Sequence, residues 1–189
     1  GSYNTALGYL ALSNNTTANF NTAIGRLSMI TNTTGASNTT LGAGALQLNT
    51  TGSNNVALGA DALVQNTTGT QNVAVGSTAL DANTEGENNV ALGYAALGAN
   101  TTADDNVSIG SFSLDANTTG HSNTAVGKSS LGANTTGSKN VCIGLGAGDA
   151  ITTGSNNTII GDFAGTTTMA DTIVLVSGTT ERMRIDSSG

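Results

Sequence analysis

Residues 55–71 read Asn-Val-Ala-Leu-Gly-Ala-Asp-Ala-Leu-Val-Gln-Asn-Thr-Thr-Gly-Thr-Gln, and this phrase recurs along the chain. The Asn that opens it, repeat position 1, returns every 17 residues without an insertion. Self-similarity at a fixed short period is the signature of a solenoid or a repeat array. Ten copies follow one another, beginning at residues 4, 21, 38, 55, 72, 89, 106, 123, 140 and 157.

The first five residues of the phrase predict a short strand and a turn. Position 2 is usually Thr or Val, position 3 is mostly small, position 4 is aliphatic and position 5 is Gly, as in Val56, Ala57, Leu58 and Gly59. Positions 2 and 4 share one face of a strand and position 3 takes the other. We expect Gly59 and its equivalents to adopt positive φ, and Leu58 and Leu63 to point inward.

The second half of the phrase adds one apolar anchor and a polar turn. Ala62 and Leu63 form either a second short strand or a single helical turn, and the strand is favoured. Residues 66–69, Asn-Thr-Thr-Gly, are residue types typical of turns with left-handed or side-chain-bonded conformations.

Stacking of identical coils is the arrangement that gives so short a unit a core, because equivalent apolar positions then lie above one another. We predict an all-β fold, a parallel β-solenoid (β-roll) of ten 17-residue coils over residues 1–173. Residues 174–189 should form a C-terminal strand and a junction segment, with no capping element. The small side chains of position 3 either line a tight interior or admit another chain closely, so we expect a homo-oligomer.

Composition excludes several classes of protein. The chain has 189 residues, of which only 5 are Lys or Arg, too few for the cationic surface that nucleic-acid binding needs. No apolar run approaches the roughly 18 residues of a membrane span, so no membrane insertion is expected. Charged residues make up 9% and aromatic residues 3%, which is low for an enzyme of this length. The single Cys142 excludes an intrachain disulfide framework.

No catalytic, cofactor-binding or metal-binding set emerges from the chemically active residues, and no cofactor is expected. His121 occupies a turn position and Cys142 replaces the small residue of position 3, so we interpret them as a solvated loop residue and a buried substitute for Ala. The aspartates do not recur at one repeat position, as carboxylates do in calcium-binding solenoids. They are Asp61, Asp81, Asp104, Asp105, Asp115 and Asp149.

The Asn-Thr-Thr triplets are also acceptor sequences for N-linked glycans. The alternative, which we favour, is that Asn and Thr build a stacked, hydrogen-bonded turn. The candidate glycan acceptors are Asn15, Asn32, Asn49, Asn66, Asn100, Asn117 and Asn134.

Two resemblances to known families follow from these motifs. Residues 89–96, Asn-Val-Ala-Leu-Gly-Tyr-Ala-Ala, resemble the head repeat of trimeric autotransporter adhesins, which form parallel β-rolls in homotrimers. Residues 181–189, Glu-Arg-Met-Arg-Ile-Asp-Ser-Ser-Gly, are similar to the junction that precedes a self-trimming intramolecular chaperone in phage and other viral tail fibres. The resemblances imply a parallel homotrimer, in register, with its polar turns facing outward.

We therefore expect a structural and adhesive fibre segment of a virion tail fibre or surface appendage, located on a virion or cell surface or outside the cell. Its repeated turns would meet a host surface or environmental surface glycans. The alternatives are a glycosylated extracellular fibril protein and an ice-binding solenoid, the latter because columns of Thr recur in the turns. A polysaccharide-degrading solenoid enzyme is disfavoured, because no coil breaks the pattern to gather acids and bases.

Overall fold

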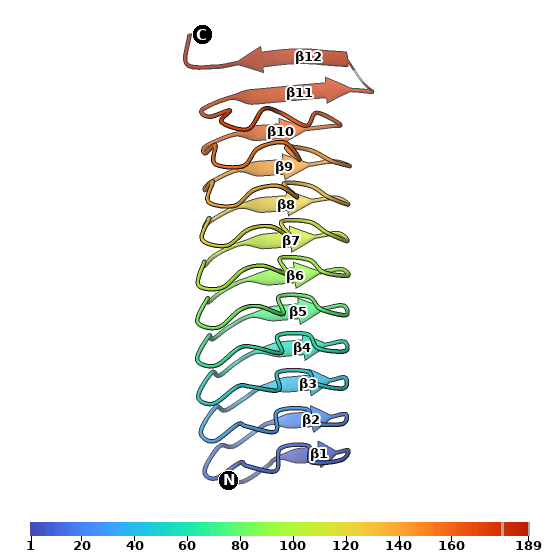
Figure 1. The fold of residues 1–189 in the computed structure, drawn as a ribbon, viewed down its shortest axis with the longest axis vertical. Coiled ribbons are helices and arrows are strands. Elements are labelled where there is room, and N and C mark those ends of the chain that lie inside the picture. The colour runs from blue at the N-terminus through green and yellow to red at the C-terminus, as the bar shows by residue number, and fades with distance from the viewer. Residues whose placement is uncertain (179, 189) are drawn as a thin grey trace.

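The computed structural model describes residues 1–178 and 180–188 and shows a straight rod of stacked coils (Figure 1). Each coil contributes one short strand to a single sheet, and no helix occurs among the described residues. The predicted β-solenoid is therefore confirmed. The strands are β1 (Thr5–Leu7), β2 (Thr22–Ile24), β3 (Thr39–Leu41), β4 (Val56–Leu58), β5 (Val73–Val75), β6 (Val90–Leu92), β7 (Val107–Ile109), β8 (Thr124–Val126), β9 (Val141–Ile143), β10 (Thr158–Ile160), β11 (Ile173–Ser177) and β12 (Thr180–Ile185).

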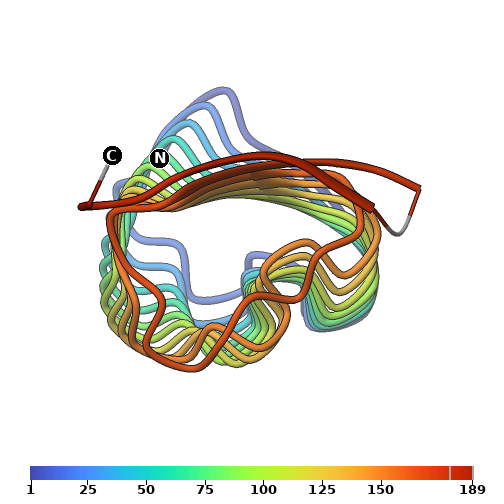
Figure 2. The same ribbon diagram turned by 90° about the horizontal axis from the view of Figure 1, so that it is seen from above.

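Strands β1 to β11 pair in parallel and in chain order, and β12 returns antiparallel to β11. Equivalent repeat positions lie opposite one another, so that Ala57 of β4 pairs with Ala74 of β5. A coil of 17 residues thus closes one full turn around the rod, and Figure 2 shows the coils superimposed in the view along its axis.

The remainder of each coil is a chain of turns rather than a second strand. The strand that we expected around Ala62 and Leu63 is wrong, and no helical turn replaces it. Asp61 and Leu63 have φ values of 56° and 53°, in the left-handed region, and a chain in which every second residue is left-handed cannot extend as a strand. The backbone of this half pairs instead with the next coil, where the Leu63 amide donates to the Ala79 carbonyl at 3.0 Å.

Gly59 confirms the predicted turn, with φ of 142°. A Cβ at Gly59 would also collide with the carbonyl oxygen of Gly76 directly beyond it in the stack. Both the backbone conformation and the close approach of successive coils therefore require glycine at position 5.

The core lies between the sheet and the turns, and it contains positions 3, 8 and 9. Ala57, Ala62 and Leu63 are fully buried, and so are their equivalents in most coils. The inward orientation expected for Leu63 is confirmed, whereas that expected for Leu58 is wrong. Positions 2 and 4 share one face of the strand, and position 3 lies on the other. Position 3 faces inward because its small side chain leaves room in the core for Leu63. Position 3 is therefore an interior column and is not available to a neighbouring chain.

Two columns of buried asparagine hold the coils together besides the backbone. At position 1, the Asn72 amide N–H donates to Asn55 Oδ1 at 3.0 Å, and Asn72 Nδ2 donates to the Gly86 carbonyl. At position 12, Asn66 Nδ2 donates to Asn49 Oδ1 at 2.9 Å and to the Gly69 carbonyl at 3.0 Å. Each buried amide thus has partners in its own coil or the next, as a buried polar group requires.

Candidate interaction surface

The side of the sheet that faces away from the core is an apolar surface, which we call the outer face. It consists of the residues at positions 2 and 4. Leu7, Leu41 and Leu92 are 67%, 53% and 44% exposed, although their neighbours along the column are also large and aliphatic. The position 4 column is Leu7, Ile24, Leu41, Leu58, Val75, Leu92, Ile109, Val126, Ile143 and Ile160, and beside it runs the position 2 column Thr5, Thr22, Thr39, Val56, Val73, Val90, Val107, Thr124, Val141 and Thr158.

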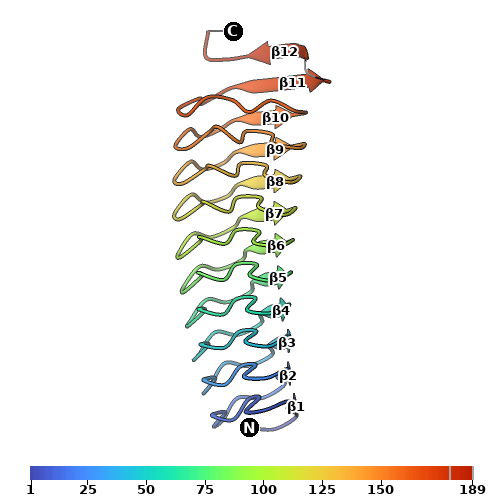
Figure 3. The ribbon, with the colours of Figure 1, turned by 45° about the vertical axis from the view of Figure 1, so that its right-hand side comes forward.

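The outer face continues without interruption across the last two strands. Leu175 of β11 pairs with Ile160 and Met183 of β12 pairs with Leu175, so both extend the position 4 column. Ile173 and Ile185 extend the position 2 column in the same way. Figure 3 shows the strands following one another along one side of the rod, without a covering layer on that side. The aliphatic position 4 column makes this face a candidate contact surface.

The Asn-Thr-Thr-Gly turns form a second, polar surface on another side of the coil. The Thr67 hydroxyl donates to the Thr84 carbonyl at 2.9 Å, and the equivalent Thr of position 13 repeats this bond from coil to coil. The next residue of each turn, at position 14, is exposed, as at Thr68 and Glu85. The position 13 column is therefore engaged in stacking and is half-buried in most coils, whereas the position 14 column is exposed throughout.

The sequon asparagines lie inside the rod. Asn32, Asn49, Asn66, Asn100, Asn117 and Asn134 have no exposed surface, and Asn15 in the first coil is partly buried. Their Nδ2 atoms, which would carry a glycan, donate hydrogen bonds to the Gly or Ala of position 15 in the same turn. A sugar on Nδ2 would have to occupy core volume, so glycosylation of the six buried residues is incompatible with this fold. The hydrogen-bonded turn that we favoured is the arrangement found.

His121 and Cys142 differ in their exposure to solvent. His121 is exposed in its turn, and its Nδ1 lies 3.3 Å from Ser122 Oγ. Cys142 is fully buried at position 3 among the core residues, and this burial raises the pKa of its thiol to about 12. A thiol with so high a pKa carries almost no thiolate at neutral pH and is a poor nucleophile.

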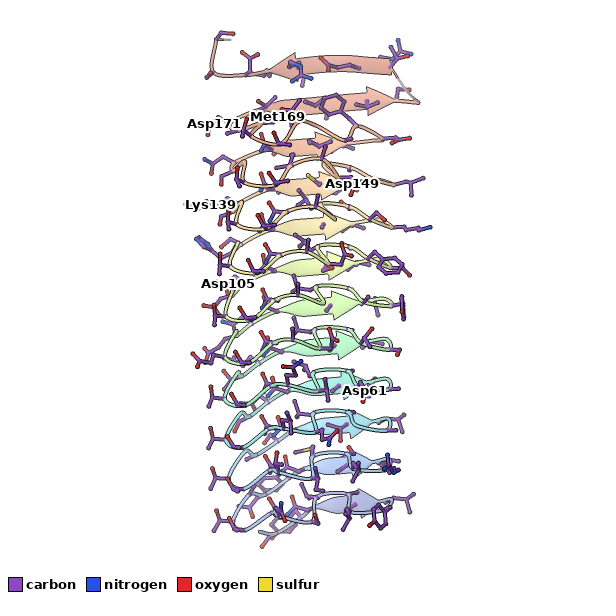
Figure 4. All side chains as sticks on the ribbon, viewed as in Figure 1. Asp61, Asp105, Lys139, Asp149, Met169 and Asp171 are labelled. Atoms are coloured by element: carbon purple, nitrogen blue, oxygen red, sulfur yellow. The ribbon has the colours of Figure 1, made fainter. Side chains whose placement is uncertain are left out.

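The aspartates lie at several heights and on several sides of the rod, as the labels of Asp61, Asp105 and Asp149 in Figure 4 show. Burial raises the pKa of Asp81 and of Asp115, against the opposing effect of backbone hydrogen bonds. Within the described residues, no three metal-ligating side chains come together and no pocket is present. The Asp104 carboxylate accepts a hydrogen bond from the Glu87 amide at 2.7 Å and so takes part in the stacking of the coils.

Comparison with known proteins adds no relative to this description. No protein-family model, curated protein or solved structure matches the chain. In the part of the chain that the structure describes, no helix is long and apolar enough to cross a membrane.

Proposed function

We propose that the chain is a segment of a fibre shaft on a virion tail fibre or another surface appendage, in which parallel copies pack together through their outer faces. The observation that carries this proposal is the continuous apolar outer face described above. It is supported by the opposite character of the turns, which are polar and lie on another side of each coil. One surface suits contact between copies, and the other suits contact with a host or environmental surface and its glycans.

The size of the outer face agrees with a stable contact between copies. Twelve strands at about 4.8 Å spacing give a length of about 58 Å, and three residues of strand give a width of about 10 Å. This footprint of about 600 Å² approaches the roughly 800 Å² that one partner buries in a standard interface. It also reaches the upper range of the apolar patches, about 300 to 600 Å², that monomers expose.

A parallel arrangement in register places like residues at the same height. Thr5, Thr22 and Thr39 then meet their own equivalents, as do Val56, Val73, Val90 and Val107 farther along the rod. An antiparallel arrangement would instead set the threonines of the first coils against Ile173 and Ile185. Closed cyclic symmetry is the common outcome for identical chains, and the resemblance to trimeric adhesins and tail fibres favours three copies.

The test compares a charge placed on the outer face with the same charge placed on a turn. Leu92→Glu introduces a carboxylate into the outer face, while Thr68→Glu copies the natural Glu85 of the next turn. Sedimentation equilibrium should give the wild-type protein and Thr68→Glu a mass three times that of the 18.5 kDa chain. Leu92→Glu should give the mass of one chain while its circular dichroism spectrum is retained.

A wild-type protein that stays at the mass of one chain throughout the micromolar range would contradict the proposal. So would a Leu92→Glu variant with the wild-type mass. Electron microscopy of the wild-type particles provides the independent readout of the fibre itself, since packed solenoids should appear as straight rods with the length of a single chain.

A further inference from the structure

The last coil departs from the repeat in its length. In the earlier coils, the side-chain oxygen of the position 1 Asn accepts a hydrogen bond from the backbone amide 17 residues later, as Asn140 does from Asn157. Asn157 Oδ1 instead accepts from the Thr172 amide, only 15 residues later, at 3.2 Å. Two residues are therefore missing from this coil. The shortening has occurred by Thr167, whose carbonyl accepts both from the Thr152 amide at 2.9 Å and from its hydroxyl.

The core changes its side chains at the same point. Gly148 stands where earlier coils place Leu or Met, and Ile151 stands where they place the Asn of position 12. A Cβ on Gly165 would lie only 2.9 Å from Ile151 Cγ1, and a Cβ on Gly148 would collide with Cys142 Sγ and lie 3.5 Å from Ile151 Cδ1. Ile159 and Val174 replace the small residue of position 3 and are fully buried. Large and small residues have thus exchanged places in the core of the last coils.

The buried asparagine column ends with this exchange. Asn134 Nδ2 donates to Asn117 Oδ1 at 2.8 Å, but Asn134 Oδ1 has no hydrogen-bond partner, because the next residue of the column is Ile151. Among the buried side-chain atoms of the described residues, this oxygen is the one left unsatisfied. The hydrogen bond to Asn134 Oδ1 is therefore lost between the eighth and ninth copies of the repeat, where the asparagine column stops.

Side chains from three segments then cover the end of the core. Arg184 pairs with Val174 across β11 and β12, which places it on the inner side of the sheet. Its guanidinium lies 5.2 Å from the ring centroid of Phe163, and Nη1 lies 3.9 Å from Met169 Sδ. Phe163 and Met169 pack in turn on the core. Arg184 is held by Glu181 through two hydrogen bonds of 3.0 and 2.6 Å.

The outermost strand also carries the features that protect a sheet edge. The register between β11 and β12 shifts between Leu175 and Val176, so that Arg182 is an extra residue in β12. A bulge twists an edge strand away from further pairing, and charged side chains on it oppose the approach of another strand. Glu181, Arg182 and Arg184 place three charges within six residues of β12.

From these observations we propose that residues 162–178 and 180–186 are an end cap, which closes the core of the solenoid and terminates its parallel ladder, and in which Arg184 over Phe163 is the lid. Terminal repeats of a solenoid need such a cap, because otherwise the last coil exposes the apolar surface that every other coil buries against a neighbour. The cap acts within one chain and is independent of the proposed fibre function.

Hydrogen exchange followed by mass spectrometry on the full chain tests the lid. Arg184→Glu sets two carboxylates against each other and removes the cation from the Phe163 ring. The rate of exchange over residues 157–176 should then rise by about tenfold. This is the effect expected when a cation–π contact and an ion pair no longer contribute to the free energy of local opening. Exchange over residues 39–109 should not change, which also reports that the variant is folded.

Arg182→Glu is the matched control, because it makes the same change of charge on the same strand at the bulged residue. It should leave exchange in both segments at the wild-type rate. Phe163→Ala should raise exchange over residues 157–176, and in that background Arg184→Glu should add less than it does in the wild type, because the two side chains act as one unit. Equal effects of Arg184→Glu and Arg182→Glu, or full additivity of Arg184→Glu with Phe163→Ala, would overturn the proposal.

Discussion

Replacing Asn66 by Asp should destabilise the rod at neutral pH and do so less in acid. Asn66 is fully buried, donates from Nδ2 to Asn49 Oδ1 and the Gly69 carbonyl, and accepts from Asn83 Nδ2 at 2.9 Å. An ionised carboxyl at this position keeps the bond from Asn83 but turns both donations into contacts between oxygen atoms. The shape of the side chain is otherwise unchanged, so the substitution isolates the hydrogen bonds of the ladder.

The magnitude follows from the acceptor that loses its donor. Asn49 Oδ1 is left without a partner, whereas the Gly69 carbonyl still accepts from Asn55 Nδ2 at 2.9 Å. A buried acceptor without a partner costs about 1 to 3 kcal/mol, to which the burial of the charge is added. A chain of this length loses roughly 2 to 4 °C of Tm per kcal/mol. Asn66→Asp should therefore lower Tm at pH 7 by about 2 to 12 °C from the lost hydrogen bond, and by more once the burial of the charge is included.

The pH dependence has a definite sign. Burial and the facing oxygen atoms raise the folded-state pKa of the introduced carboxyl above its unfolded value of about 3.9. The destabilisation is therefore complete above the folded pKa and shrinks as the pH falls toward the unfolded value, because the protonated form can again donate one hydrogen bond.

Asn54→Asp is the control, because Asn54 is exposed in the same turn region and its φ of 60° is one that Asp also tolerates. The measurement is the difference in Tm between the two variants from pH 7 to pH 4, which cancels the titration of the remaining carboxylates. Equal Tm values at pH 7, or a difference that widens in acid, would show that the buried amide ladder does not stabilise the rod as described.

Three further predictions concern the core and the turns. Leu63→Ala should destabilise the chain by about 2 to 5 kcal/mol in urea unfolding, whereas Leu58→Ala, tested as the single chain in a Leu92→Glu background, should cost much less; the reverse order would place position 4 inside. Cys142, whose pKa is raised to about 12 by burial, should resist iodoacetamide at pH 8 and react only after unfolding, and rapid labelling of the native protein would contradict its burial. Gly59→Ala should lower Tm, because the added Cβ would collide with the carbonyl of Gly76, whereas Ala60→Gly at the neighbouring exposed residue should change Tm little. Equal effects of the two substitutions on Tm would argue against the close approach of the coils.

The period of the sequence was sufficient to predict the first strand of each coil, the order of these strands and the turn at Gly59, because every coil repeats the same local pattern, but it also suggested a second strand that does not form. It was not sufficient to decide which strand face lies inside. A strand of three residues has no long alternation of apolar and polar residues, and Leu58 is more hydrophobic than Ala57. The deciding residue is Leu63, which comes from the opposite wall and fills the space that Ala57 leaves.

The stacked turn was favoured from the sequence, but the burial of the sequon asparagines was not foreseen, because a motif for glycosylation and a motif for a stacked turn contain the same residues. The end cap was missed altogether. Its signals are present in the sequence, since Gly148 and Ile151 break two columns at once in the ninth copy. Each replacement alone resembles ordinary variation, and their compensation becomes evident only when the Ile151 side chain is seen to lie beside Gly148.

Near-identical coils also raise the question of how the chain selects a single arrangement, since looping out one complete repeat would preserve almost every ladder. The buried hydroxyls supply an answer. Ser28 Oγ and Thr40 Oγ1 lie 2.6 Å apart in the core, and each replaces an Ala of the standard coil. If the third coil were looped out, Ser28 would face Ala57 and would exchange the Thr40 hydroxyl for a backbone carbonyl, the kind of partner that Ser113 Oγ has at Ala125. Ser108 donates to the Ser113 carbonyl of its own coil at 2.7 Å, a bond that does not depend on which coil lies next to it. The pair Ser28 and Thr40 thus favours the native neighbour by the difference between a hydroxyl and a carbonyl partner, while the regular residues provide the stability of the stack.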